Sequence, residues 1–162
     1  VPKDNLLGEA GMGFIYLMRE LPQERLSIAV SAVAACEAVI QETVKYVKQR
    51  TAFGKAIADF QHTQFKLAEL EAEVTVMRVF IDRCAELLVK KELSTVEASK
   101  AKLLATELQG KVTDQCVQMH GGYGYMWEYP VARAYADARV QRIYGGTSEV
   151  MKLIIGRDLL AD

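Results

Sequence analysis

Residues 50–55 form a short Arg-Thr-Ala-Phe-Gly-Lys segment whose side chains suit the binding of a phosphate and an aromatic ring system. The Arg50 guanidinium can bind a phosphate through two parallel hydrogen bonds, and Phe53 can present its ring to a flat heterocycle. The same pattern is typical of an ordinary helix end, where a cation faces the helix dipole and Gly54 stops the helix. The residues alone leave both interpretations open.

Two further glycine-containing segments, residues 118–124 and 144–149, have a similar potential. The pair Gly121-Gly122 lets a backbone approach a ligand closely, although it can equally serve as a plain helix-terminating turn. In the last segment Thr147 suits the N-cap position of a following helix. The positive end of that helix would favour an anionic or carbonyl group of a ligand.

The composition indicates one folded domain that must position these segments. The chain has 162 residues, of which 51% are hydrophobic and 25% charged, with a formal net charge of -1. This balance carries no electrostatic sign of nucleic-acid binding. We find no apolar run long enough to span a bilayer and no signal-peptide pattern at the N-terminus, so we expect no stable membrane insertion.

The spacing of apolar residues predicts long helices. The stretch 23–50 is rich in Ala, Val, Ile and Leu, and Pro22 either begins this helix or kinks one that starts near Gly13. A second helix is predicted over 61–92, because apolar residues recur at gaps of three and four. These residues are Leu67, Leu70, Val74, Met77, Ile81, Cys84 and Leu88.

A capping-box pattern at Ser94-Thr95-Val96-Glu97 predicts the start of a third helix, which runs to about residue 120. A short helix is expected after Pro130, and a last one from residue 147 or 148 to 160. The predicted fold is therefore all-α, an antiparallel four-helix bundle with an additional short helix. Its inward positions on the third helix are Ala101, Ala105, Leu108, Val112, Cys116 and Met119.

The cysteines and histidines do not suggest a metal site or a disulfide framework. Cys36, Cys84 and Cys116 lie far apart in apolar helical stretches and are interpreted as reduced core residues. Neither His62 nor His120 is spaced to share a metal ion with a cysteine. We therefore expect no structural metal.

Taken together, the three segments, in this order and separation, resemble the C-terminal domain of the acyl-CoA dehydrogenases. The resemblance implies an FAD enzyme that converts acyl-CoA to trans-2-enoyl-CoA in fatty-acid β-oxidation or branched-chain acyl catabolism. It also implies that residues 1–13 are a lead-in from a preceding β domain, and that residues 14–162 form the helical bundle domain. A fragment of this kind is expected to be inactive alone.

The resemblance also assigns ligand contacts to individual residues. The loop after the first long helix would contact the FAD of a neighbouring subunit, the second glycine segment its adenosine half, and the start of the last helix the flavin nucleotide. These cofactor residues are Arg50, Ala52, Phe53, Gln61, Gln118, Gly121, Gly122, Thr147 and Glu149. The substrate would contact Arg25, Tyr144 and Gly146.

The catalytic base is the feature in which this chain departs from many relatives. Many family members carry a glutamate directly after the tyrosine, where this chain has Gly145. In the branch that includes the long-chain and isovaleryl enzymes, the base lies instead on the first long helix, directly before an arginine. Glu24 matches that position, with Glu20 as a weaker candidate, and the Gly145 backbone N–H would hydrogen-bond the thioester oxygen.

The resemblance finally implies partners and a compartment. Electron-transfer flavoprotein would accept the electrons, the protein would be a homo-oligomer (a tetramer or a dimer), and it would lie in the bacterial cytoplasm or the mitochondrial matrix. Two other functions stay open at this point. One is a non-enzymatic helical scaffold or oligomerisation module, and the other is an acyl-CoA oxidase, which passes electrons to oxygen.

Overall fold

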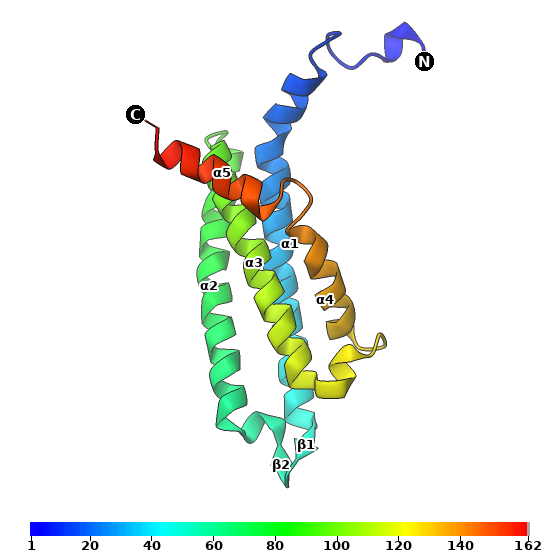
Figure 1. The fold of residues 1–162 in the computed structure, drawn as a ribbon, viewed down its shortest axis with the longest axis vertical. Coiled ribbons are helices and arrows are strands. Elements are labelled where there is room, and N and C mark those ends of the chain that lie inside the picture. The colour runs from blue at the N-terminus through cyan, green and yellow to red at the C-terminus, as the bar shows by residue number, and fades with distance from the viewer. Residues whose placement is uncertain (162) are drawn as a thin grey trace.

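The computed structural model describes residues 1–161, and helices dominate this part of the chain (Figure 1). The α-helices are α1 (Gly13–Gln49), α2 (Gln61–Val89), α3 (Thr95–His120), α4 (Pro130–Gln141) and α5 (Ser148–Leu159). Short 3-10 segments occur at η1 (Lys3–Asn5), η2 (Ile57–Asp59) and η3 (Gly121–Tyr125). A small antiparallel hairpin joins β1 (Thr51–Ala52) to β2 (Lys55–Ala56). The predicted all-α fold is confirmed.

The long helices α1, α2 and α3 run side by side, α4 lies along them, and α5 crosses one end (Figure 1). The hairpin lies at the opposite end of the bundle (Figure 1). Because successive helices reverse direction, α1 and α3 both finish at the hairpin end. The turn between α4 and α5 lies at the other end, against α1. This alternation sets which distant segments of the sequence can meet.

Helix α1 begins at Gly13 and carries Pro22 in its interior, so the proline does not start the helix. Contrary to the sequence-based expectation, α1 is long and apolar enough to cross a membrane by length and composition, with an 18-residue window of mean hydropathy 1.4. Length and composition alone are weak support for a membrane span, because the core helix of a soluble protein passes the same test. Its apolar face packs in the bundle core.

The core consists mainly of small and β-branched side chains. Ala98, Ala101 and Ala105 of α3 are fully buried, which lets α1 and α3 approach closely. The N-terminus of α3 has the predicted capping box, in which Ser94 Oγ accepts a hydrogen bond from the Glu97 N–H at 3.0 Å. The three cysteines are free and buried, and burial raises the pKa of the Cys36 thiol to about 12.

Candidate functional site

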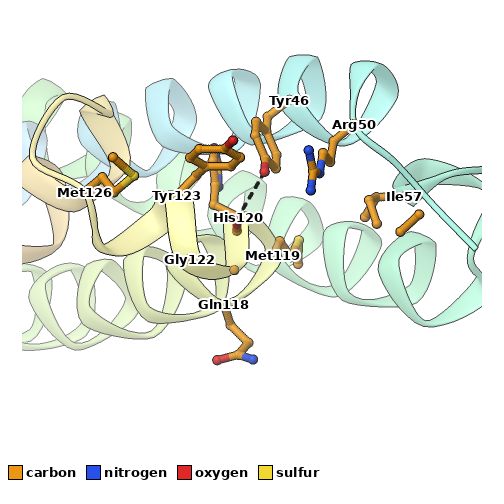
Figure 2. A pocket seen from close by; sticks show the side chains of 11 residues that line it. Tyr46, Arg50, Ile57, Gln118, Met119, His120, Gly122, Tyr123 and Met126 are labelled. Atoms are coloured by element: carbon orange, nitrogen blue, oxygen red, sulfur yellow. Dashed lines mark hydrogen bonds between the residues drawn. The ribbon is translucent and has the colours of Figure 1, made fainter.

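The sequence-predicted residues gather at the two ends of the bundle. At the hairpin end, a pocket of about 590 Å³ opens between the C-terminal ends of α1 and α3 (Figure 2). It brings together predicted residues from segments about seventy positions apart, because both helices finish there. The lining residues are Tyr46, Arg50, Ala52, Ile57, Gln118, Met119, His120, Gly121, Gly122, Tyr123 and Met126.

Arg50 supplies the positive charge of this pocket. It caps the C-terminus of α1, and its guanidinium lies 5.5 Å from the centre of the Tyr123 ring. This is the geometry of a cation–π contact. Gln118 lines the pocket, although Figure 2 shows its side chain pointing away from Tyr46, Tyr123 and Arg50. The arrangement suits an anionic group joined to a flat ring system.

The hairpin tip extends beyond the pocket. Phe53 and Gly54 have φ values of 52° and 81°, as a tight two-residue turn of type I′ requires. Phe53 is 95% exposed, and its ring packs edge-on against Phe60 at 6.3 Å between centroids. Gln61 opens α2 and is exposed. Neither Phe53 nor Gln61 lines the pocket, so the structure does not bring these two predicted residues to it.

His120, to which the sequence assigned no role, organises the wall of the pocket. Its buried ring donates from Nδ1 to the Cys116 carbonyl at 2.8 Å, since a carbonyl oxygen can only accept. Tyr46 stacks on this ring at 4.1 Å between centroids and donates its hydroxyl to the His120 carbonyl at 3.2 Å. A signal for Tyr46 was present, because it lies one helical turn before Arg50 and shares its face.

We expect His120 to make the stability of the protein depend on pH. Burial lowers the pKa of His120 below its ordinary value of 6.5, although the bond to Cys116 acts in the opposite direction. Below pH 6.5 the unfolded chain then binds a proton that the folded chain resists, so the free energy of unfolding falls as pH falls and is unaffected by His120 above pH 6.5. Urea unfolding between pH 7.5 and 5 should show this fall.

The matched control is His120→Phe, which keeps a ring against Tyr46 and cannot titrate. Its unfolding free energy should depend less steeply on pH than that of the wild type. Equal slopes for the wild type and His120→Phe would rule out this role for His120.

At the other end of the bundle, two buried cations hold the turn between α4 and α5. Arg25 of α1 is 5% exposed, and its Nε donates to the Gly145 carbonyl at 3.3 Å. A second nitrogen of Arg25 donates to Ser99 Oγ at 3.3 Å. Lys102 of α3 is fully buried and donates from Nζ to the Gly146 carbonyl at 2.7 Å. Burial, with Arg25 nearby, lowers the pKa of Lys102.

The backbone conformation at position 145 disfavours a side chain, and Ile28 packs against the turn there. Gly145 has φ of +64°, and a Cβ there would lie 2.6 Å from Ile28 Cδ1. Ile28 lies one helical turn after Glu24, so the two side chains share a face of α1. Glu24 is exposed and directly precedes the buried Arg25. The candidate base and the Gly145 turn therefore lie on the same side of the bundle.

The start of α5 carries the remaining predicted residues. Thr147 is the N-cap, and its Oγ1 accepts from the Val150 N–H at 3.3 Å. The Glu149 backbone N–H and then the Thr147 hydroxyl lower the pKa of the Glu149 carboxyl by hydrogen bonding. Thr147 and Glu149 line a small polar pocket of about 180 Å³ together with Arg139. Tyr144, in the turn before α5, is 45% exposed.

The two clusters are too far apart in one chain to contact one small ligand. Arg25 and Arg50 are 25 residues apart on one helix, which corresponds to roughly 37 Å at 1.5 Å per residue. If both clusters bind the same kind of cofactor, each copy of that cofactor must be shared by two chains.

A family model for the acyl-CoA dehydrogenase C-terminal domain matches residues 11–160. The chain belongs to the acyl-CoA dehydrogenase family. Over all 162 residues it is 56% identical to the mitochondrial long-chain specific acyl-CoA dehydrogenase of Rattus norvegicus, of which it spans 38%. The chain thus spans about two fifths of the length of this curated acyl-CoA dehydrogenase.

Solved acyl-CoA dehydrogenases share the fold closely. The enzyme from Geobacillus kaustophilus superposes with a TM-score of 0.95 at 49% identity, covering 99% of this chain and 42% of that one. An acyl-CoA dehydrogenase from Bacillus anthracis, solved in complex with FAD, superposes with a TM-score of 0.91 at 32% identity. The superposition covers 99% of this chain and 31% of the Bacillus anthracis chain.

Proposed function

We propose that this chain is the C-terminal domain of an FAD-dependent acyl-CoA dehydrogenase, and that Glu24 is its catalytic base. The observation that carries the proposal is the packing of Ile28 and Arg25 against the Gly145 turn. Because Glu24 lies directly before Arg25 and one helical turn before Ile28, this packing supports a position of its carboxylate beside a turn with free backbone donors. Removal of an α-proton requires a carboxylate of this kind, held against the substrate.

Several residues of this chain have separate roles in the proposed reaction. Glu24 takes the α-proton of the acyl thioester as a general base. The Gly145 N–H donates to the thioester oxygen, and this hydrogen bond strengthens as enolate charge develops. Arg25 holds the turn that carries the donor and supplies positive charge beside the substrate. FAD, when bound, supplies the hydride acceptor.

The residues of both clusters fit FAD. The pocket at the hairpin end combines the Arg50 guanidinium, the Tyr123 ring and exposed glycine backbone, which suit the phosphate and adenosine part. The Thr147 cap at the start of α5 suits the flavin nucleotide part. Because the clusters are roughly 37 Å apart along α1, we infer that two subunits share each FAD. The protein is then a homo-oligomer, and its companion electron acceptor is an electron-transfer flavoprotein.

The test is anaerobic titration of the purified full-length flavoprotein with acyl-CoAs of increasing chain length and branching. Bleaching of the oxidised flavin absorbance supports a dehydrogenase, and the acyl-CoA that bleaches fastest identifies the substrate class. A protein that carries no flavin and bleaches with no acyl-CoA would contradict the proposal and favour a scaffold. Rapid reoxidation by oxygen after bleaching would instead favour an oxidase. Recovery of the protein from bacterial cytoplasm or mitochondrial matrix would test the compartment.

Phe53 offers a separate prediction about FAD sharing. We expect Phe53→Asn to leave the free energy of unfolding within about 0.5 kcal/mol, because relief of the left-handed backbone offsets the lost contact with Phe60. Flavin retention should nevertheless fall, because the exposed ring is proposed to touch the cofactor of a neighbouring subunit. The flavin-to-protein ratio after gel filtration measures this. An unchanged ratio would show that the ring does not contribute to retention.

The matched control is Phe65→Asn, which removes another exposed phenylalanine, on the nearby helix α2. It lies outside the pocket at the hairpin end and should keep the wild-type flavin content. Equal losses in both variants would indicate a general effect of removing surface aromatic groups.

A further inference from the structure

Lys102 is a buried lysine that the predicted site did not include. Its side chain is 0% exposed, and its ammonium donates to the Gly146 carbonyl at 2.7 Å. The neighbouring carbonyl, that of Gly145, is held by Arg25. Two buried cations from two different helices therefore bind two consecutive carbonyls of one turn.

This arrangement sets the direction of the backbone donors. In a trans peptide the C=O and the following N–H point in opposite directions, and the described chain has no cis peptide bonds. Because both carbonyls face the bundle interior, the N–H groups of Gly146 and Thr147 face away from it. Among residues 1–161, no hydrogen-bond acceptor is seen for the N–H groups of Gly145, Gly146 or Thr147. These donors are available to a ligand.

Packing alone does not require a charge at position 102. Burying an ammonium group costs several kcal/mol, and replacing a buried ion by an apolar group of similar volume is often neutral or stabilising. Arg25 adds a second positive charge nearby, and the facing acidic groups Glu24, Glu107 and Glu149 are all exposed. The result is a positive potential behind the turn, on the side opposite its free donors.

We propose that Lys102 is a positioning residue for the α-proton abstraction, acting through the Gly146 carbonyl. It fixes the turn that carries the Gly145 N–H, the proposed donor to the thioester oxygen, and its charge favours the enolate that forms when Glu24 takes the proton. Lys102 itself touches neither substrate nor cofactor. The inference rests on the proposed function and adds to it a residue that does not contact the reacting atoms.

The test uses Lys102→Met and Lys102→Gln in the full-length flavoprotein, with acetoacetyl-CoA as the probe. This β-ketoacyl thioester ionises to an enolate that absorbs in the ultraviolet, so the enolate-to-keto ratio of the bound probe can be read directly. Removal of one hydrogen-bond donor to a developing oxyanion typically lowers kcat about a hundredfold or more, and we expect removal of an indirect contribution to have a smaller effect. We expect Lys102→Met to lower the ratio about tenfold to a hundredfold, and Lys102→Gln to lower it less, because an amide can still donate to Gly146.

Two controls separate positioning from a structural role. Lys100→Met removes an exposed lysine from the same helix and should keep the wild-type ratio. The Tm and the Kd for a saturated acyl-CoA should change little in Lys102→Met, because its effect is on the enolate. A fall in Tm with an unchanged enolate ratio would overturn the proposal.

Amide hydrogen exchange at residues 145–147 gives a readout that does not depend on catalytic activity. If Lys102 holds the turn, exchange there should be at least several-fold faster in Lys102→Met and in Lys102→Gln than in Lys100→Met. Unchanged exchange in both Lys102 variants would refute the positioning role. If wild-type flavin fails to bleach with any acyl-CoA, the proposed function fails, while amide exchange still decides whether Lys102 positions the turn.

Discussion

Glu24→Gln is expected to abolish rapid flavin reduction while leaving substrate binding intact. The amide keeps the size and polarity of the side chain, but it cannot accept the α-proton. A positioned general base contributes roughly 10²- to 10⁴-fold to the rate, so anaerobic bleaching by the best acyl-CoA should slow by a factor in that range. Stopped-flow absorbance measures this rate. The Kd for the same acyl-CoA should stay within about threefold, since Glu24 is exposed and no hydrogen bond or salt bridge is seen for its side chain among residues 1–161.

Glu20→Gln is the matched control, because Glu20 lies one helical turn earlier on the same side of α1 and is also exposed. It should bleach at close to the wild-type rate. If Glu20→Gln is slow and Glu24→Gln is fast, the base lies one turn nearer the N-terminus than proposed. If neither variant is slow, the base comes from outside this stretch of α1.

The clustering of the predicted cofactor residues follows from helix direction, which the sequence pattern already contained. Three long helices joined by short connections must alternate in direction, so the ends of the first and third helix meet. This is why Arg50 and Gly121 line one pocket. The hairpin was not predicted, because its turn places Phe53 at positive φ, where local preference favours glycine or asparagine.

Lys102 differs, because the sequence pattern of buried positions on α3 included it, but it was not predicted to be buried. Buried positions on α3 repeat at gaps of four and three, and the repeat includes a lysine and a glutamine: Ala98, Lys102, Ala105, Gln109, Val112 and Cys116. A lysine on an apolar face is normally assigned to the surface, since lysines are almost never buried without a partner. The partner here is a backbone carbonyl 44 positions away, which no local pattern reveals.

Gly124→Ala is expected to destabilise the hairpin-end site through a collision with the backbone. A Cβ at position 124 would lie 2.3 Å from the Val117 carbonyl oxygen and 3.0 Å from His120 Cβ. A backbone oxygen cannot rotate away as a side-chain end can, so η3 must move relative to α3. Overpacking of this kind costs about 1–3 kcal/mol. For a chain of this size each kcal/mol lowers Tm by roughly 2–4 °C, so thermal unfolding should detect the loss.

Gly122→Ala is the control that separates crowding from the loss of a glycine. It lies two residues away in the same 3-10 segment, and an added Cβ there meets nothing within 4 Å. Its Tm should correspond to a free energy of unfolding within about 0.5 kcal/mol of the wild-type value. Because Tyr123 stands between these glycines and faces Arg50, movement of η3 in Gly124→Ala should also lower flavin retention. Equal losses of Tm in the two variants would show that crowding at Gly124 is not the cause. If Gly124→Ala is destabilised but retains its flavin, the η3 wall of the pocket does not contribute to cofactor binding.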